Sequence, residues 1–222
     1  MVKGRAVKAA VIVAHPDDET IWTGGTILMH PKCCWTIVSL CRAGDPDRAP
    51  KFRRAATEFG AAGFIGDLDD GPEQNPVERM LEKTLLELLP DDAFDLVITH
   101  SPFGEYTRHR RHEETGRVIC ALWERGRIKA DEIRLFAYAD AGKGGMDDLP
   151  GPIRRAHTII QLPQDVWQRK HHILTEIYGF GPDSYESKIC RPEEAFWVFD
   201  SVTELDNWKT IEGKKNESTG SI

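Results

Sequence analysis

The 222-residue sequence lacks several features that would direct it to particular functions. No stretch approaches the roughly 18 consecutive apolar residues of a membrane span, so we expect no membrane partner. The net charge is −7, and lysine and arginine are interspersed with acidic residues. A nucleic acid is therefore not an expected partner, because phosphate backbones require a concentrated positive surface. The absence of a G-x-G-x-x-G motif and of a P-loop disfavours a nucleotide-binding function.

Cysteine is also scarce and shows no pairing pattern. The five cysteines are an odd number and form no C-x-x-C pair. This pattern predicts reduced thiols and hence a cytoplasmic protein. Residues 1–10 carry basic side chains but no long apolar core, so we interpret them as the lead-in to a strand and not as a signal peptide.

Apolar runs alternate with amphipathic stretches along the chain. Strands are predicted at residues 7–13, 36–41, 64–68, 94–99, 133–139, 158–162 and 195–199, and helices at residues 20–29, 49–59, 76–89, 113–123 and 163–178. The alternation predicts a single α/β domain with a Rossmann-like, mainly parallel sheet and helices on both faces. We expect this domain to cover residues 1–205, followed by a polar tail over residues 206–222 that frays from residue 212.

Titratable residues crowd the end of the first predicted strand. His15, Asp17, Asp18 and Glu19 follow it directly. Close carboxylates repel one another, and a divalent cation would resolve that conflict. Imidazole and carboxylate are suitable ligands for zinc or a similar first-row metal. The alternative is a helix N-terminus whose acids complement the helix dipole, which explains one or two acids but not the adjacent histidine.

A second polar segment follows the strand at residues 94–99. His109 and His112 are three residues apart, a spacing that places both imidazoles on one face of a helix start. A ligand from this segment would complete a three-ligand metal site and leave a position open for water. Surface histidines are the commoner explanation of H-x-x-H alone. Both polar segments follow strands, however, and parallel sheets bind ligands where strands end.

These motifs resemble one known family. Ala14-His-Pro-Asp-Asp-Glu19, the following Gly24-Gly25, and Thr99-His100-x-Pro-x-Gly-Glu-Tyr106 leading to His109-x-x-His112 are similar to the PIG-L / LmbE-like deacetylases. This family contains zinc-dependent de-N-acetylases of N-acetylglucosamine conjugates, including mycothiol and bacillithiol biosynthetic enzymes. The resemblance is dense over residues 8–120. It implies a Zn²⁺ cofactor, with Fe²⁺ as the alternative, and a small N-acetylated amino-sugar substrate. A homo-oligomer is compatible with it.

The resemblance also implies residue roles. The implied metal ligands are His15, Asp18 and His112. Asp17 would be the general base, and His109 would polarise or protonate the reacting group. The implied or candidate substrate contacts are Arg42, Asp45, Asp70, Tyr106, Arg110 and Arg111.

The second motif departs from the family pattern. Arg110 and Arg111 stand where the family usually has Pro-Asp or an asparagine. They either bind an anionic substrate group or pair with Glu113 and Glu114. Tyr106 lies three residues before His109, one further than in the mycothiol-type enzymes, which weakens the case for Tyr106 as an oxyanion partner.

The expected reaction is amide hydrolysis. A metal lowers the pKa of bound water toward ~7 and polarises the carbonyl. Asp17 would take the proton from the water, and the metal and His109 would hold the oxyanion. Two alternatives stay open: a deacylase of another small acylamino compound, and a metal-retaining binding module without turnover. The presence of Asp17 argues against the second.

Overall fold

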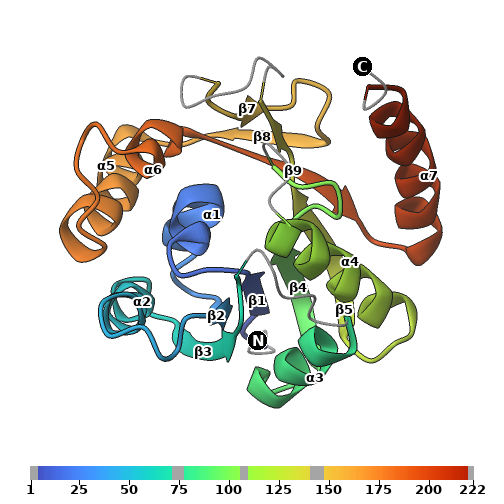
Figure 1. Cartoon of the computed structure of the whole chain (residues 1–222), viewed down its shortest axis with the longest axis horizontal. Coiled ribbons are helices and arrows are strands. Elements are labelled where there is room, and N and C mark those ends of the chain that lie inside the picture. The colour runs from blue at the N-terminus through green and yellow to red at the C-terminus, as the bar shows by residue number, and fades with distance from the viewer. Residues whose placement is uncertain (1–4, 72–77, 106–109, 141–147, 220–222) are drawn as a thin grey trace.

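The computed structural model describes residues 5–71, 78–105, 110–140 and 148–219, with side chains described as far as residue 214. Strands and helices alternate through the first half of the chain (Figure 1). The elements there are β1 (Lys8–Val13), α1 (Asp18–Met29), β2 (Cys34–Cys41), α2 (Arg48–Glu58), β3 (Ala62–Leu68), α3 (Glu78–Leu88), β4 (Ala93–Thr99), α4 (Arg110–Glu124) and β5 (Lys129–Phe136).

The second half of the chain is less regular. It contains β6 (Tyr138–Ala139), β7 (Gly151–Pro152), β8 (Thr158–Gln161), α5 (Gln164–His172), the π-helix η1 (Ile173–Ile177), α6 (Tyr185–Ile189), β9 (Glu193–Phe199) and α7 (Val202–Thr219).

One seven-stranded sheet organises the molecule. Its strand order is β3-β2-β1-β4-β5-β9-β8. The pairs from β3 to β5 are parallel, whereas β9 pairs antiparallel with β5 and β8. Helices α1, α2 and α5 lie on one side of the sheet, and α3, α4 and α7 on the other (Figure 1). The predicted Rossmann-like fold is therefore confirmed.

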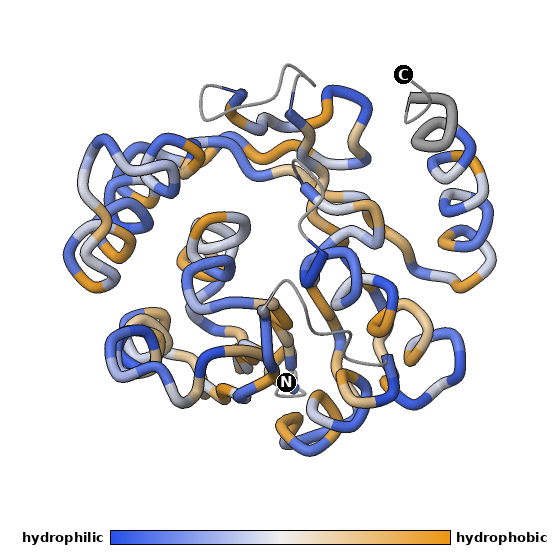
Figure 2. Tube along the Cα trace, in the orientation of Figure 1, coloured by the Kyte–Doolittle hydropathy of each residue, from blue (hydrophilic) through white to orange (hydrophobic). Residues whose placement is uncertain are grey.

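The core follows the apolar strands. In β1, residues Ala9 to Val13 are completely buried, because helices cover both faces of a parallel sheet and leave no solvent-facing position. Figure 2 shows hydrophobic stretches along the strands, while the helices alternate hydrophobic and hydrophilic residues. This difference in pattern is why the strands were predictable from short continuous apolar runs.

The centre of the sheet contains a topological switch point. From β1 the chain proceeds outward to β2 and β3, then returns to the other side of β1 for β4 and β5. Connections after β1 and β4 therefore leave in opposite directions, which opens a crevice at the carboxyl ends of these two strands. Both polar segments singled out in the sequence follow these strands.

The C-terminal residues differ most from expectation. Helix α7 extends to Thr219, so fraying from residue 212 is not observed in the described residues. Leu205 and Trp208 are buried, and both oxygens of the Glu212 carboxylate accept hydrogen bonds from Arg155 at 2.6 Å. The few apolar residues of this helix give it little periodic signal. The division of the chain at residue 205 stays a prediction.

Two smaller differences concern helix type and length. The helix predicted over residues 163–178 changes to a π-helix at Ile173, and the short α6 has no counterpart in the predicted elements.

Among the residues that the structure describes, none of the helices is both long and apolar enough to cross a membrane.

The docking of α7 can be tested by comparing two of its residues. Trp208 packs against Phe103, Trp197 and Phe199 at ring-centroid distances of 5.2–5.5 Å, whereas Ile211 is 55% exposed. Trp208→Ala should lower the free energy of unfolding by about 3–5 kcal/mol, and Ile211→Ala by less than about 0.5 kcal/mol. Urea unfolding measures both. Equal values for the two variants would contradict the docking.

Candidate active site

The turn between β1 and α1 positions the first group of polar residues. Asp17 is the N-cap residue of α1, with a positive φ of 102°. Its carbonyl oxygen accepts hydrogen bonds from the N–H groups of Thr20 and Ile21, both at 2.9 Å. Asp18 and Glu19 form the buried first helical turn. The sequence therefore places three acids where the partial positive charge of a helix N-terminus favours them.

The Asp18 carboxylate is the centre of a cluster that it forms with His15, His100 and His112. Its Oδ2 lies 3.3 Å from His15 Nδ1, 3.4 Å from His100 Nε2 and 3.3 Å from His112 Nε2. The backbone N–H of His15 donates to the same oxygen at 2.9 Å, and Trp22 Nε1 donates to Oδ1 at 3.2 Å. Burial favours the neutral acid, but the neighbouring imidazoles, His112 foremost and then His100, together outweigh it and hold the pKa of Asp18 well below its usual range.

Glu105 supports His112 from behind. Its Oε2 lies 2.7 Å from His112 Nδ1, and its Oε1 accepts from the Ser101 N–H at 2.9 Å. Burial opposes charge on both groups, yet the imidazoles of His100 and His112 together lower the pKa of Glu105 to about 2. Together with Asp18, Glu105 raises the pKa of His112 to about 10. A carboxylate on the outer nitrogen of a histidine orients the ring and raises its basicity toward a metal.

His100 is fixed in one tautomer by the backbone. The Ala14 N–H can only donate, and it points to His100 Nε2 at 3.1 Å. Nε2 therefore accepts, and Nδ1 carries the proton, which faces Glu105 Oε2 at 3.1 Å. The ring stacks on His112 with a centroid distance of 4.0 Å. His100 thus joins the end of β1 to the start of α4.

Two groups of side chains in the described residues have metal-ligand spacing. His15, Asp18 and His112 form one, and His100, Glu105 and His112 form the other, with donor atoms within 4.8 Å of one another in each. The second group is fully buried, and its His100 Nε2 already accepts a hydrogen bond. In the first group, His15 is 14% exposed, which gives an ion access to the site.

The first group fits a catalytic metal. Two imidazoles and one carboxylate converge there, and such a set leaves coordination positions open. Burial lowers the pKa of His15 and so favours its neutral, metal-binding form. These three residues are those expected from the sequence, and the structure brings them together.

Asp17 lies beside this group without belonging to it. Its Oδ2 accepts from Arg48 Nη1 at 2.9 Å, and its backbone N–H donates to Glu19 Oε2 at 3.0 Å. Burial, reinforced by the Asp18 charge, raises the pKa of Asp17 well above its usual range, although Arg48 opposes this. A carboxylate with a raised pKa is suited to general-base work near neutral pH.

A shallow recess adjoins the cluster. It has a volume of about 300 Å³ and is lined by Arg42, Asp45, Asp67, Leu68, Asp69 and Asp70. Asp70 Oδ2 lies 3.6 Å from His15 Nε2 and accepts from Arg42 Nη2 at 2.8 Å. Three of the expected substrate contacts, Arg42, Asp45 and Asp70, therefore surround one opening next to His15.

The two arginines of the second motif pair with an acid. Arg110 Nε donates to Glu114 Oε1 at 2.7 Å, and Arg111 Nη1 donates to Glu114 Oε2. Arg111 Nε also donates to the carbonyl oxygen of Asp69 at 2.9 Å. These contacts favour the ion-pair interpretation over anion binding. Tyr106 and His109 lie outside the described residues.

Several residues of the site were not assigned a role from the sequence. His100 and Glu105 stand within the recognised motif, and the position of His100 directly after a strand was an available signal. Arg48 had no comparable signal, because its partner Asp17 is 31 residues away in the sequence.

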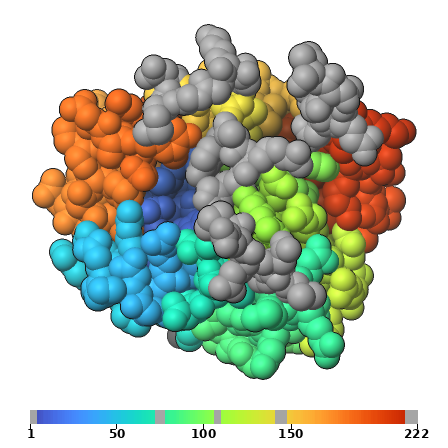
Figure 3. Space-filling model, in the orientation of Figure 1, coloured from blue at the N-terminus to red at the C-terminus, as the bar shows by residue number. Residues whose placement is uncertain are grey.

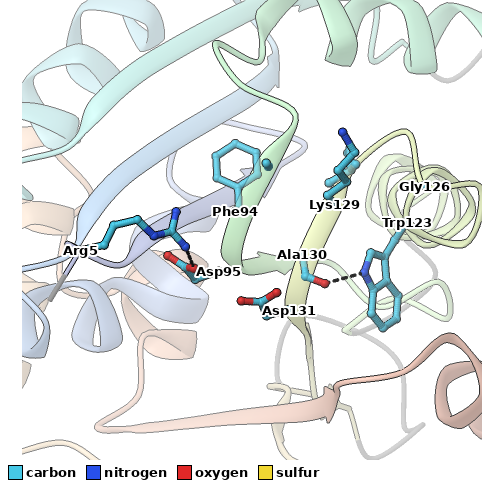
Figure 4. A pocket seen from close by; sticks show the side chains of 10 residues that line it. Arg5, Phe94, Asp95, Trp123, Gly126, Lys129, Ala130 and Asp131 are labelled. Atoms are coloured by element: carbon cyan, nitrogen blue, oxygen red, sulfur yellow. Dashed lines mark hydrogen bonds and ion pairs between the residues drawn. The ribbon is translucent and has the colours of Figure 1, made fainter.

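A second depression lies elsewhere on the molecule. It has a volume of about 380 Å³ and includes Arg5, Asp95, Trp123 and Lys129 near the beginnings of β4 and β5 (Figure 4). Arg5 pairs with Asp95 there, and Trp123 donates to the Ala130 carbonyl oxygen at 3.0 Å. Its lining residues include no histidine and lie at the strand ends opposite the cluster, so we do not regard it as the active site.

The fold and the cluster together define a Rossmann-like α/β protein with a histidine–aspartate site at its switch point. The family model described as PIG-L, GlcNAc-PI de-N-acetylase, matches residues 10–123, just over half of the chain. The chain belongs to this deacetylase family. The match ends at the last turn of α4, so it includes every residue of the cluster.

Solved structures share the fold at low sequence identity. N,N'-diacetylchitobiose deacetylase from Pyrococcus horikoshii has 17% identity and a TM-score of 0.64, with 88% of this chain and 84% of that chain covered. A triple mutant of a deacetylase of teicoplanin biosynthesis has 13% identity and a TM-score of 0.64, with 87% and 98% covered.

A third similar structure carries a different activity in its name. GalB, the 4-carboxy-2-hydroxymuconate hydratase from Pseudomonas putida, has 16% identity and a TM-score of 0.56, with 97% of this chain and 90% of that chain covered. No curated protein sequence matches the chain. At these identities the likeness to solved structures shows the fold alone.

Gly116 allows α4 to approach the turn after β4. A Cβ on this residue would lie 2.6 Å from three backbone atoms of residues 100–102. Gly116→Ala should therefore push α4 and His112 away from this turn, with a loss of about 1–3 kcal/mol in unfolding free energy and weaker zinc binding. Urea unfolding and chelator competition measure the two effects. Arg117→Ala, at the half-exposed neighbouring position, is the control. Equal zinc affinity in both variants would contradict this role.

Because Glu105 supports His112, replacing Glu105 should lower the affinity of the site for a metal ion. Glu105→Gln removes the charge behind the His112 imidazole and should weaken zinc binding by about 10–100-fold. Competition with a chromophoric chelator measures this dissociation constant. Glu124→Gln, at the far end of α4, should bind zinc like the unmodified chain. Unchanged affinity in Glu105→Gln would show that Glu105 does not support a metal ligand.

Proposed function

We propose that this chain is a zinc-dependent hydrolase that removes the acetyl group from an N-acetylglucosamine-type conjugate. The convergence of His15, Asp18 and His112, with the carboxylate of Asp17 beside them, carries this proposal. Membership of a deacetylase family supports the same reaction.

His15, Asp18 and His112 would hold the ion. Zinc accepts two imidazoles and a carboxylate while keeping a position open, and ferrous iron accepts the same set. When bound, the ion supplies a Lewis acid that polarises the amide carbonyl and lowers the pKa of water. Because His15 is partly exposed and its Nε2 lies 3.6 Å from Asp70, which lines the recess, the substrate would approach from that side.

Asp17 would act as the general base. It takes a proton from the attacking water, and the water oxygen forms a bond to the acetyl carbon. The C–N bond then breaks, and the amine leaves after receiving a proton, which gives acetate and a free amino sugar. The ion pair with Arg48 holds the Asp17 carboxylate in one orientation, and orientation is a large part of catalytic efficiency. We assign polarisation or protonation of the reacting group to His109.

The recess beside His15 would receive the sugar. Carboxylates such as Asp45 and Asp70 accept hydrogen bonds from sugar hydroxyl groups, and Arg42 donates to sugar oxygens. Tyr106 is a further candidate contact. The pairing of Arg110 and Arg111 with Glu114 favours a neutral sugar over a phosphorylated one.

The general-base assignment can be tested by substitution of Asp17. Asp17→Asn keeps the shape of the side chain but cannot accept the proton, so kcat for acetate release should fall about 10²–10⁴-fold. Zinc content should be unchanged, because Asp17 is not one of the proposed ligands. N-acetylglucosamine, N,N'-diacetylchitobiose and simple N-acetyl amino acids, assayed with zinc-loaded protein, give the substrate class.

A matched control and two contrary outcomes complete this test. Asp47→Asn alters an exposed acid next to Arg48 and should keep full activity. Unchanged kcat in Asp17→Asn would refute the base assignment. Retained zinc without acetate release from any substrate in the unmodified chain would instead indicate a binding module.

A further inference from the structure

Asp17 has a backbone conformation that needs external support. Its φ of 102° lies in a region that residues with a Cβ rarely adopt. Such conformations persist where the surrounding structure overdetermines them. Two groups hold Asp17 in addition to the helix it caps: Glu19 binds its backbone N–H, and Arg48 binds its carboxylate.

The first support leads to Tyr178. The Tyr178 hydroxyl donates to Glu19 Oε1 at 2.7 Å, while Glu19 Oε2 accepts from the Asp17 N–H at 3.0 Å. Both Tyr178 and Glu19 are buried. The hydroxyl of Thr20 donates to the same Oε1 at 2.6 Å. These bonds fix the Glu19 carboxylate, and through it the backbone of Asp17.

The second support leads to Phe180. The Arg48 guanidinium lies over the Phe180 ring, with 4.6 Å between Cζ and the ring centroid, and donates to Asp17 Oδ2 at 2.9 Å. An aromatic face attracts a guanidinium and restricts the positions it can take. Phe180 therefore holds Arg48 beside Asp17.

Both supports come from one short segment. The π-helix η1 ends where the Tyr178 N–H donates to the Ile173 carbonyl oxygen at 3.1 Å, and Gly179 then turns the chain with a φ of 80°. This turn places Tyr178 against α1 and Phe180 against the start of α2. The surfaces of α2 and of the α5–α6 segment adjoin in Figure 3. Single π-turns within helices are often found at functional sites.

We propose that Tyr178 and Phe180 are positioning residues for the Asp17 carboxylate, Tyr178 through Glu19 and Phe180 through Arg48. The inference rests on the proposed role of Asp17 as general base. In the described residues, the Tyr178 hydroxyl bonds to Glu19, and the Phe180 ring contacts Tyr178 and Arg48; none of these partners is a proposed metal ligand. Removal of either side chain should therefore alter the orientation of the base and leave the ion in place.

Kinetics of three variants test this inference. Tyr178→Phe and Phe180→Leu should each lower kcat for acetate release about 10–100-fold, the scale of an ångström-sized misplacement, with unchanged KM and zinc content. Tyr138→Phe, which removes a buried hydroxyl that bonds to Glu193 and Ala195, is the control for the first variant. Phe103→Leu, next to Trp208, is the control for the second.

Epistasis separates positioning from a general loss of structure. In an Asp17→Asn background, Tyr178→Phe should change the residual kcat less than twofold, because no base remains to be positioned. Multiplicative losses in the double variant, or loss of zinc in Tyr178→Phe, would overturn the inference.

Crystal structures of the two variants provide a readout that does not depend on activity. In Tyr178→Phe the Asp17 backbone should move to a negative φ, and in Phe180→Leu the Arg48–Asp17 ion pair should open. If Asp17 keeps its conformation and its ion pair in both variants, the inference is wrong, whatever reaction the protein catalyses. If Asp17 moves while the unmodified chain hydrolyses no amide, the proposed function fails and the supporting contacts stand.

Discussion

The constraint on which the site depends is the placement of three imidazoles around one oxygen of Asp18. His15, His100 and His112 come from three separate segments of the chain, yet each has a ring nitrogen within 3.4 Å of Oδ2. A separate contact fixes each segment. The His15 N–H bonds to Asp18 at the start of α1, and the Ala14 N–H bonds to His100. Gly116 lets α4, which carries His112, pack against residues 100–102. The attraction between Asp18 and His112 lowers the pKa of the acid and raises that of the imidazole, and a bound cation would replace this attraction.

Around this centre, the residues proposed to bind the metal ion are distinct from Asp17, the residue proposed to transfer a proton. The ligands lie in the turn after β1, at the start of α1 and in α4, close to the switch point of the sheet, and the buried Glu105 supports His112. Asp17 is held by a different pair of residues, Arg48 and Glu19. Adjacent aspartates thus experience different surroundings: the pKa of Asp18 is held far below that of a free acid, whereas burial raises the pKa of Asp17. This divergence is the arrangement expected when one acid binds a cation and its neighbour moves a proton.

Sequence predicted the elements of this site better than its contacts. Continuous apolar runs revealed the buried strands, and because parallel strands end at one edge, the segments after residues 13 and 99 were expected to meet. The meeting of His15, Asp18 and His112 follows from that topology. The roles of His100 and Glu105, and the ion pair between Arg48 and Asp17, depend on side-chain directions after packing, which leave no local pattern. The π-helix and the docking of α7 were missed for a related reason, since long-range contacts decide both.

The most direct test is to locate the metal in the full chain. Crystals of zinc-loaded protein, measured on both sides of the zinc absorption edge, give the ion's position from anomalous differences. We predict one strong peak about 2.0–2.2 Å from a ring nitrogen of His15, a ring nitrogen of His112 and a carboxylate oxygen of Asp18. A peak between His100 and Glu105, or no peak near Asp18, would contradict the proposed centre.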